Sequence, residues 1–515
     1  MQKSKPKSMS LKLTGYDLDI DDVWNVAHSD VQVNLCDKAV EKINESRSYI
    51  QGRIDKGDIM YGVNTGFGHF ADVAISKDQL VELQKNLIRS HSVGVGAPFE
   101  PREVKAIMLL RANALTRGHS GIRPKVVEKI LEFINHNIIP YIPSQGSVGA
   151  SGDLAPLAHL ALSLIGEGSV WDGVKKTKTS DKLKELGIEP LELQFKEGLS
   201  LINGCQVMTA VGLLNCFRAR RVLQLFDCAG AMTLEALKGS RAAFDPLISA
   251  TRAHPGEAKT ARNMLKLLGE TSPIADSHLD CGRVQDAYSL RCIPAVHGAA
   301  KDSVGRVIEV LVVEANSSTD NPLVFAKEGK ILSCGNFHGE PVAFQLDYLA
   351  ICLSALASIS ECRIEKLINP SMSNLPAFLA PEGGLNSGMM IVQVAAASLV
   401  SENKILAHPA SVDSIPTSAD KEDHVSMGTI AARKAKAVLE NAEKILAMEF
   451  LCATQGLDML KPLKPAGVIL EVLNFIRKGV PFAQKDRVFA DDIEAIAQMI
   501  ADGSLNKAIK LELEV

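Results

Sequence analysis

Three small residues, Ala150-Ser151-Gly152, form a string that can do chemistry with its own backbone. If the loop is compressed, the amide nitrogen of Gly152 can attack the carbonyl carbon of Ala150, and loss of water closes a five-membered ring. Loss of the Ser151 hydroxyl as a second water leaves an exocyclic methylene, which is an electrophile. A side chain at position 152 would obstruct the ring. The tripeptide alone equally suits a plain helix-capping loop, and by itself it favours that simpler interpretation.

The elements on either side of the tripeptide would position it. Residues 139–153, IPYIPSQGSVGASGD, contain two prolines and three glycines, which predicts a loop. The apolar run that begins at Leu154 predicts a helix, capped by Ser151 or Asp153, with Pro156 in its first turn. Such a helix directs partial positive charge at the loop, which would assist an electrophile.

Most of the remaining chain predicts helices. Apolar residues recur at helical spacing in several stretches, namely 77–94, 102–118, 206–239, 341–367, 387–406 and 430–454. Several of these stretches are apolar on more than one face, which is typical of a large bundle or a subunit interface. Residues 1–20 predict a loose start, and strand signals are few and short. We expect a mainly α fold, with a smaller N-terminal lobe (residues 1–200) that carries the loop and a long-helix bundle with C-terminal helices (residues 201–515).

The overall composition excludes several classes of protein. The 515 residues carry a net charge of -4, with 46% hydrophobic and 23% charged residues, which disfavours a nucleic-acid partner. The longest uncharged window, residues 383–401, contains Gly, Asn, Gln and Ser, so it predicts a buried core helix and not a membrane span. The ten cysteines are scattered without a C-x-x-C pair, which suits a reducing cytoplasm.

Three short strings resemble known functional motifs, but each lacks a residue that the motif requires. GFGHFA from Gly66 and GVGAPF from Gly94 lack the third glycine of a dinucleotide-binding loop. GASGD around Ser151 has Asp153 where a nucleophile elbow needs glycine. The twelve histidines occur singly along the chain, so no metal site is predicted.

The sequence around the tripeptide has a wider resemblance. Residues 147–162, SVGASGDLAPLAHLAL, resemble the signature of the aromatic amino acid ammonia-lyases and aminomutases, whose prosthetic group is 4-methylidene-imidazole-5-one (MIO). Six further stretches resemble family motifs in the family's order: YGVNTGFG (61–68), LINGCQ (201–206), QDAYSLRC (285–292), TDNPLVF (319–325), GNFHGE (335–340) and EDHVSMG (422–428). The resemblance covers nearly the whole chain from about residue 10.

This resemblance implies a fold, a cofactor and a reaction. It implies a fumarase- or aspartase-like helical fold and a homotetramer whose active sites draw on more than one subunit. Ala150, Ser151 and Gly152 would form MIO autocatalytically, with no external cofactor. The implied reaction is that of a carbon–nitrogen lyase, in which an amino acid loses ammonia and a β-proton.

The resemblance also implies roles for individual residues. Tyr61 would be the base, with Tyr288 as a second hydroxyl, and the division of work between them stays open. A tyrosine of reference pKa about 10 needs a lowered pKa or transient deprotonation for that role. Arg291 would pair with the substrate carboxylate in a bidentate fashion. The spacing of Gln285, Tyr288 and Arg291 by three would place them on one face of a helical segment.

Three more residues would complete the implied site. Asn203 and Asn321 resemble family residues that hold the MIO ring or the substrate carboxylate, although asparagines alone are more often turn or cap residues. Phe337 would form a wall against the ring.

Two positions favour histidine as the substrate. The chain has Ser90-His91 where phenylalanine enzymes of the family have Phe-Leu and tyrosine enzymes have His-Leu, and a histidine can hydrogen-bond an imidazole edge. Glu422 stands where those enzymes typically carry a neutral amide, and its carboxylate can accept from an imidazole or ammonium. Taken singly, His91 suits a capping or core histidine, and Glu422 suits a solvated surface charge.

We therefore expect conversion of L-histidine to trans-urocanate and ammonia, the first step of histidine degradation. One alternative is a phenylalanine or tyrosine lyase, or an aminomutase, of the same family. Another is a helical scaffold or an argininosuccinate-lyase-like protein that uses the same bundle without MIO.

Overall fold

The computed structural model describes residues 10–66, 75–76 and 79–515. The chain forms two compact units, each built from three segments. Unit 1 comprises Met1–Leu214, Ile308–Asp347 and Pro409–Arg433, and unit 2 comprises Asn215–Val307, Tyr348–His408 and Lys434–Val515. The assignment of residues 1–200 and 201–515 to two domains stays a prediction. Unit 1 takes in segments from both sides of residue 200, whereas all three segments of unit 2 follow it.

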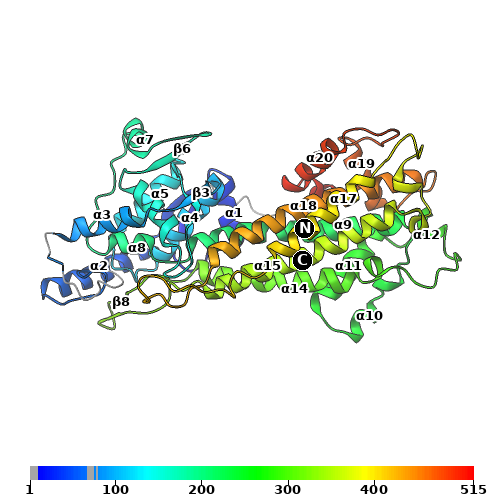
Figure 1. Cartoon of the computed structure of the whole chain (residues 1–515). Helices are drawn as coiled ribbons and strands as arrows, with labels where there is room; N and C mark the ends of the chain where they lie inside the picture. The colour runs from blue at the N-terminus through cyan, green and yellow to red at the C-terminus, as the bar shows by residue number, and fades with distance from the viewer. Residues whose placement is uncertain (1–9, 67–74, 77–78) are drawn as a thin grey trace. The chain divides into compact units, whose positions relative to one another are not determined.

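Helices dominate the described residues, so the predicted mainly α fold is confirmed (Figure 1). The α-helices are α1 (Ile20–His28), α2 (Asp37–Asp55), α3 (Leu80–His91), α4 (Pro101–Thr116), α5 (Pro124–Asn135), α6 (Leu154–Leu164), α7 (Thr179–Leu186), α8 (Glu197–Ile202), α9 (Gln206–Ala236), α10 (Pro246–Thr251), α11 (Pro255–Leu268), α12 (Pro273–Asp276), α13 (Tyr288–Arg291), α14 (Ile293–Ala315), α15 (Glu340–Ile368), α16 (Pro370–Ser373), α17 (Met390–Leu406), α18 (Gly428–Met459), α19 (Gly467–Arg477), α20 (Phe489–Ala501) and α21 (Ser504–Ala508). The 3₁₀ turns are η3 (Ala242–Phe244) and η4 (Ala377–Leu379).

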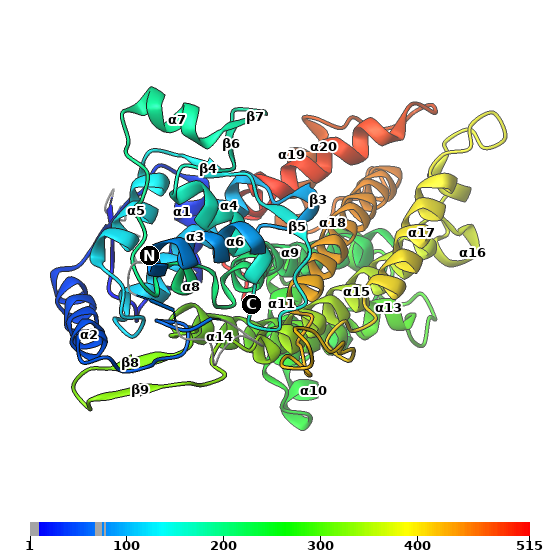
Figure 2. The ribbon, with the colours of Figure 1, turned by 60° about the vertical axis from the view of Figure 1, so that its left-hand side comes forward.

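The strands are short, as predicted. They are β1 (Ser10–Leu13), β2 (Gln32–Leu35), β3 (Val95–Pro98), β4 (Ile139–Pro140), β5 (Pro143–Gln145), β6 (Ser169–Asp172), β7 (Lys175–Lys178), β8 (Leu323–Phe325) and β9 (Lys330–Leu332). They pair as β1-β2, β3-β5, β4-β6-β7 and β8-β9. The β8-β9 pair is an antiparallel hairpin, and β8 contacts α2 (Figure 2). The pairing of β1 with β2 in parallel corrects the expectation that residues 10–13 are loose, whereas residues 1–9 lie outside the described part.

Helix α4 forms the centre of unit 1. Pro101 occupies its first turn, and Glu100 and Glu103 form a reciprocal capping box at its start. Every residue from Glu103 to Thr116 is buried, and the helix packs against α1, α2 and α5. This explains why apolar residues occur on several faces of the helix and why its polar side chains, such as Arg111, need buried partners.

Unit 2 contains a bundle of four long helices, joined by buried ion pairs. The Arg363 guanidinium on α15 lies 2.6 Å from a carboxylate oxygen of Glu449 on α18. The Asp227 carboxylate on α9 pairs with His297 at 2.9 Å and Lys301 at 2.6 Å, both on α14. Loss of one member of a buried pair typically costs about 3–5 kcal/mol, so these contacts fix how the four helices align.

Two apolar helices bear on the prediction of no membrane span. Helix α15 is long and apolar enough to cross a membrane, but 56% of its most apolar window is buried within the folded chain, as in core helices of soluble proteins. The uncharged window 383–401 leads into α17, which was expected to be a buried core helix. In the single chain α17 buries Val392 and Ala396, whereas Ile391 is 65% exposed, so only one face of this helix is covered.

Candidate active site

The backbone at Gly152 has a conformation that only glycine fits. Its φ is +73°, and it forms an isolated parallel bridge with Gly204. The Asp153 amide donates to the Gly204 carbonyl at 2.8 Å. A Cβ added at Gly152 would lie 2.3 Å from the Gly204 carbonyl oxygen. The position that chemical reasoning required to be free of a side chain is therefore also one that the fold keeps free.

The other side of the tripeptide packs against the segment before α18. The Met427 amide donates to the Val148 carbonyl at 2.8 Å, and the Ser426 hydroxyl donates to the Gly149 carbonyl at 3.2 Å. Ala150 lies in a buried apolar cluster with Met427. The loop is thus held on both sides by segments that are distant in sequence.

Asp153 has a different role from the one predicted for it. It occupies the N-cap position of α6, but its side chain makes no capping bond to that helix. Its carboxylate instead accepts from the amides of Val207 at 2.9 Å and Met208 at 3.0 Å, at the start of α9. The hydroxyl of Thr429, at the start of α18, also donates to it. Burial raises the pKa of Asp153 to about 6, and these hydrogen bonds oppose the shift.

Three helices therefore begin beside the tripeptide. Helix α6 starts at Leu154 directly after it, and Asp153 contacts the first turns of α9 and α18. Helix N-termini carry partial positive charge, which falls off within the first turn. The sequence predicted one such helix end beside the loop, and the structure adds two more. The partial positive charge of the three helix N-termini therefore favours an electrophile in the loop.

Ser151 contacts two of the predicted site residues. Its hydroxyl donates to the Glu422 carboxylate at 3.0 Å, and its carbonyl accepts from the Asn203 side-chain amide at 3.3 Å. The second oxygen of Glu422 accepts from the hydroxyls of Thr417 at 2.8 Å and Ser418 at 2.7 Å. Glu422 is therefore a half-buried, oriented carboxylate and not a solvated surface charge.

His91 is the last residue of α3 and is half-buried. The Ser90 hydroxyl lies 3.1 Å from its Nδ1. Burial lowers the pKa of His91 below its usual value, and the electrostatic attraction of Glu422 opposes this shift. Burial thus favours the neutral form of the His91 imidazole, and Glu422 lies close enough for its charge to act on this ring.

Phe337 and Asn321 are joined to the site through their neighbours. The Cys205 thiol, two residues after Asn203, donates to the Phe337 carbonyl at 3.0 Å. The Asn321 side-chain oxygen accepts from the Cys334 amide at 2.7 Å, which fixes the segment that leads to Phe337. A direct role of either residue toward a ring or a substrate stays a prediction.

Arg111 is a supporting residue that the sequence interpretation missed. Its guanidinium is fully buried on α4 and donates to the Asn203 carbonyl at 2.8 Å and to the Gln206 side chain at 2.6 Å. Burial lowers the pKa of Arg111 to about 10, and the charge of Asp320 opposes this shift. The signal was present in the sequence, since a lone arginine inside the apolar run IMLLRANAL must find buried partners.

Tyr61, the predicted base, lies in the turn that follows α2 and is half-buried. Its neighbours Met60 and Val63 belong to a buried apolar cluster, and the Gly62 amide donates to the Thr65 hydroxyl at 3.0 Å. Residues 67 and 68 of the same motif, and most of the GFGHFA string, lie outside the described residues. The role of Tyr61 stays a prediction.

Gln285, Tyr288 and Arg291 belong to unit 2, whereas the residues described above belong to unit 1. The expectation that all three share a helix face is wrong, because α13 begins at Tyr288 and Gln285 precedes it in extended chain. The Arg291 guanidinium lies 4.4 Å from the centre of the Tyr288 ring and donates to the Asp286 carbonyl at 3.2 Å. Tyr288 is 72% exposed in the single chain.

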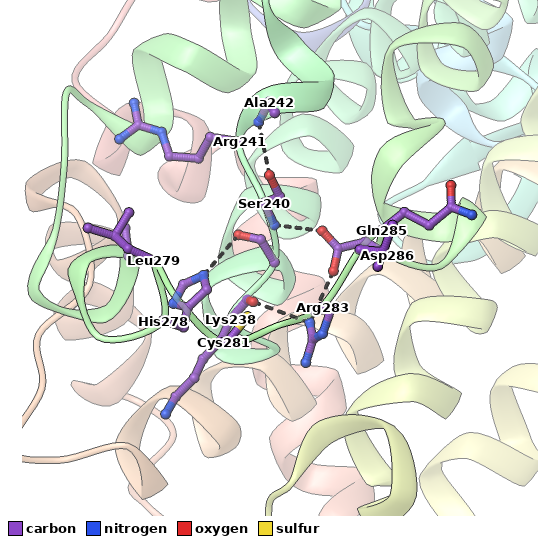
Figure 3. Close-up of a pocket in the computed structure, with 13 residues that line it drawn as sticks. Lys238, Ser240, Arg241, Ala242, His278, Leu279, Cys281, Arg283, Gln285 and Asp286 are labelled. Atoms are coloured by element: carbon purple, nitrogen blue, oxygen red, sulfur yellow. Dashed lines mark hydrogen bonds and ion pairs between the residues drawn. The ribbon is translucent and has the colours of Figure 1, made fainter.

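Gln285 contributes to a pocket of unit 2 (Figure 3). This cavity of about 310 Å³ is lined by cationic groups that include Arg241 and Arg283. Arg283 pairs with Asp286 at 3.0 Å, which partly neutralises the lining. The residues that line this pocket all belong to unit 2 and include none of the loop residues described above.

Comparison with known proteins covers nearly the whole chain. The family described as aromatic amino acid lyase matches residues 18–478. The histidine ammonia-lyase of Gloeobacter violaceus is 48% identical over 501 residues, covering 97% of each chain. The crystal structure of histidine ammonia-lyase from Trypanosoma cruzi has a TM-score of 0.91 and 44% identity, covering 97% of this chain and 95% of that one. The tyrosine aminomutase of Streptomyces globisporus has a TM-score of 0.92 and 39% identity, covering 98% of this chain and 100% of that one.

The matched residues include the tripeptide loop, both of its flanking segments and the motif on α13. Family membership also establishes that the chain is an enzyme of the lyase class. The loop geometry and the full-length similarity agree, and this chain belongs to the aromatic amino acid lyase family.

Proposed function

We propose that this chain eliminates ammonia from L-histidine to give trans-urocanate. The observation that carries the proposal is the Glu422 carboxylate beside the tripeptide, 3.0 Å from the Ser151 hydroxyl, together with the half-buried His91, whose pKa burial lowers. An imidazole substrate needs one acceptor and one group that can donate or accept, and these two side chains supply both. The full-length relatives named histidine ammonia-lyase support the same substrate.

We propose that Ala150, Ser151 and Gly152 form the MIO group. The residues present fit it, because Gly152 has no room for a Cβ and the amide of Asn203 holds the carbonyl of Ser151. Ring closure joins the Gly152 amide nitrogen to the Ala150 carbonyl carbon and releases that carbonyl oxygen as one water, with the N–H hydrogens of Gly152 and Ser151. Loss of the Ser151 hydroxyl with the Cα hydrogen of Ser151 releases the second water and leaves the methylene. When formed, MIO supplies the electrophile that makes the substrate amine a good leaving group. No external cofactor is needed.

The remaining task is to remove a β-proton that is not acidic in water. We assign this task to Tyr61, with Tyr288 as a second hydroxyl. The hydroxyls of Thr417 and Ser418 orient Glu422 after Ser151 has lost its own hydroxyl, and the Glu422 carboxylate then fixes the substrate's imidazole or ammonium. Holding the β-carbon within reach of a base supplies much of the rate enhancement of such reactions. Phe337 lines the site beside the loop.

Arg291 would bind the substrate carboxylate, with help from Gln285 and Asn321. In this proposal the active enzyme is a cytoplasmic homotetramer, without nucleic-acid or membrane partners, in which a second subunit brings Arg291 to the loop. The single chain leaves several apolar side chains of unit 2 exposed, namely Leu279 (79%), Val284 (97%), Ile391 (65%), Val394 (53%) and Ile405 (75%). Subunit contacts that cover these residues would stabilise such an assembly.

The shared site predicts complementation between two inactive variants. Co-expression of Ser151→Ala with Arg291→Ala should restore about one quarter of wild-type activity, because random assembly leaves one site in four with both groups intact. If the loop and Arg291 came from the same chain, no mixed site would be intact, and the mixture would be as inactive as each parent. The measurement is ultraviolet absorbance of the conjugated acrylate product.

The substrate assignment is tested by offering L-histidine, L-phenylalanine and L-tyrosine separately. Product is expected from histidine alone, and product from phenylalanine without product from histidine would overturn the assignment. In His91→Leu, kcat/KM for histidine should fall about 10- to 100-fold, because an imidazole edge loses its hydrogen-bond partner. His408→Ala, at an exposed position, serves as the matched control.

A further inference from the structure

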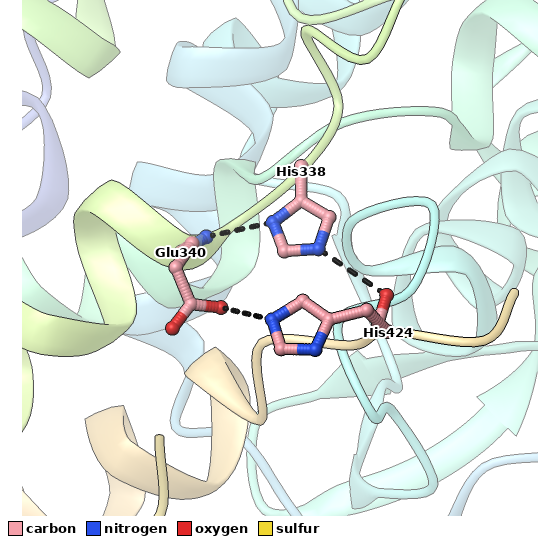
Figure 4. A group of neighbouring side chains, drawn as sticks. All are labelled: His338, Glu340 and His424. Carbon is pink, nitrogen blue, oxygen red and sulfur yellow. Dashed lines mark hydrogen bonds and ion pairs between the residues drawn. The ribbon is translucent and has the colours of Figure 1, made fainter. Parts of the chain in front are cut away.

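Three metal-binding side chains converge next to the loop, although the sequence predicted no metal site. Each of His338, Glu340 and His424 offers one ligand atom, and these atoms lie within 4.8 Å of one another (Figure 4). Glu340 is the first residue of α15, and His338 lies two residues before it. His424 lies in the segment before α18. The histidines occur singly along the chain, so only the fold brings two of them together.

The Glu340 carboxylate has an unsatisfied oxygen that faces this cluster. Its Oε2 is buried and has no hydrogen-bond partner. The His424 Nε2 lies 3.8 Å from this oxygen, which is too far for a hydrogen bond. Among residues 10–66, 75–76 and 79–515, this long contact is the ion pair that Glu340 makes. A buried carboxylate oxygen without a donor is costly. A cation between Glu340 and the two imidazoles would remove that cost.

Both ring nitrogens of the His338 side chain face backbone groups of the other two residues of the cluster. One of its nitrogens, Nε2, lies 3.3 Å from the His424 carbonyl oxygen, to which it can donate. The other, Nδ1, accepts from the Glu340 amide at 3.3 Å, so an ion bound at Nδ1 would replace this long hydrogen bond. Metal-ligating histidines commonly donate their second ring N–H to a backbone carbonyl in this way. The two histidine rings are parallel, with an interplanar angle of 2°.

We propose that His338, Glu340 and His424 bind one divalent transition-metal ion, of which Zn²⁺ fits best. Two imidazoles and one carboxylate suit Zn²⁺ and its neighbours, whereas Mg²⁺ and Ca²⁺ prefer oxygen ligands throughout. Three protein ligands leave at least one coordination position for water. The proposal goes beyond the lyase reaction and does not depend on which amino acid is the substrate.

Such an ion would join two segments that carry active-site residues. His338 directly follows Phe337, and His424 lies two residues after Glu422. Gly339 between the two ligands on the α15 side is tightly packed, since an added Cβ would lie 2.8 Å from the Ser426 hydroxyl oxygen. Metal binding would therefore stabilise the folded arrangement of both segments by mass action.

The test is a Co²⁺ titration of the full-length, tag-free and chelator-treated protein, followed by visible absorption. L-Histidine is left out because the free amino acid chelates the metal. The wild-type chain should bind one Co²⁺, which Zn²⁺ displaces, and Zn²⁺ should raise its thermal midpoint. Loss of one ligand in His424→Ala or Glu340→Gln should weaken binding at least about tenfold, as outer-sphere changes already cost 10- to 100-fold. His408→Ala should bind as wild type does.

Three outcomes would overturn the proposal: no saturable Co²⁺ spectrum in the wild-type chain, unchanged binding in both ligand variants, or a loss of binding in His91→Ala with none in His424→Ala. Glu340→Gln preserves the shape of the side chain, so it decides the matter if His424→Ala does not fold. Because the readouts are a spectrum and a melting temperature, a failed metal site is distinguishable from a wrong substrate.

Discussion

Replacing Ser151 with alanine should lower kcat for L-histidine by more than about 10³-fold, since loss of a single electrostatic donor in other enzymes already costs 10²–10³. Alanine has no hydroxyl to eliminate, so the methylene cannot form. The change removes the side-chain hydrogen bond from Ser151 to Glu422 and leaves the backbone hydrogen bonds of the loop in place. The variant should therefore fold with nearly unchanged stability.

The measurement is kcat from ultraviolet absorbance, together with a far-ultraviolet circular dichroism spectrum of the same sample. Ser163→Ala is the matched control, because its hydroxyl donates to the His159 carbonyl within α6, away from the loop. The control should keep its activity. A Ser151→Ala variant that retained a tenth of wild-type turnover would exclude Ser151 as the source of the methylene.

Replacing Asp153 with alanine should lower the free energy of unfolding by about 2–4 kcal/mol, because it leaves two buried helix amides without an acceptor. These amides belong to Val207 and Met208, and the hydroxyl of Thr429 loses its acceptor as well. The starts of α9 and α18 would lose these side-chain bonds to the loop, so ring formation should also become less efficient. Thermal unfolding measures the first effect, with Asp172→Ala at an exposed position as the control.

The pKa of Asp153 adds a pH signature to this experiment. Its value of about 6 in the folded chain lies above the ordinary 3.8. Between these two values the folded chain binds the proton more tightly than the unfolded chain, so the contribution of Asp153 to stability falls as the pH rises through this window. The isosteric Asp153→Asn cannot ionise. The difference in melting temperature between wild type and Asp153→Asn should therefore change across this window and level off above it.

Much of the site could be predicted because the chemistry demands particular residue types. The chemistry needs a serine at 151 and no side chain at 152, and the fold keeps position 152 free of a side chain for an independent steric reason. Long apolar stretches fixed the helices equally well, since α4, α9 and α18 must bury several faces. The contact between Ser151 and Glu422 was not predicted, although both residues were assigned to the site.

What the sequence left open depends on contacts between distant segments. Ser151 or Asp153 was expected to cap the helix that follows, yet the Asp153 carboxylate accepts from the start of α9 instead. A stretch of sequence cannot reveal which distant helix end will pack against it. Spacing by three suggested one helix face for Gln285 and Arg291, but a helical turn needs backbone bonds that begin only at Tyr288. The His338 and His424 cluster was invisible for the same reason, because its members are 86 residues apart.

The central claim is that the chain makes its own electrophile, and mass spectrometry tests it most directly. Intact mass and peptide mapping of the active protein should show a mass lower than that of the encoded chain by two water molecules. The loss should map to the peptide that contains Ala150, Ser151 and Gly152, and it should be absent from Ser151→Ala. An unmodified Ala150-Ser151-Gly152 peptide in fully active protein would contradict the account.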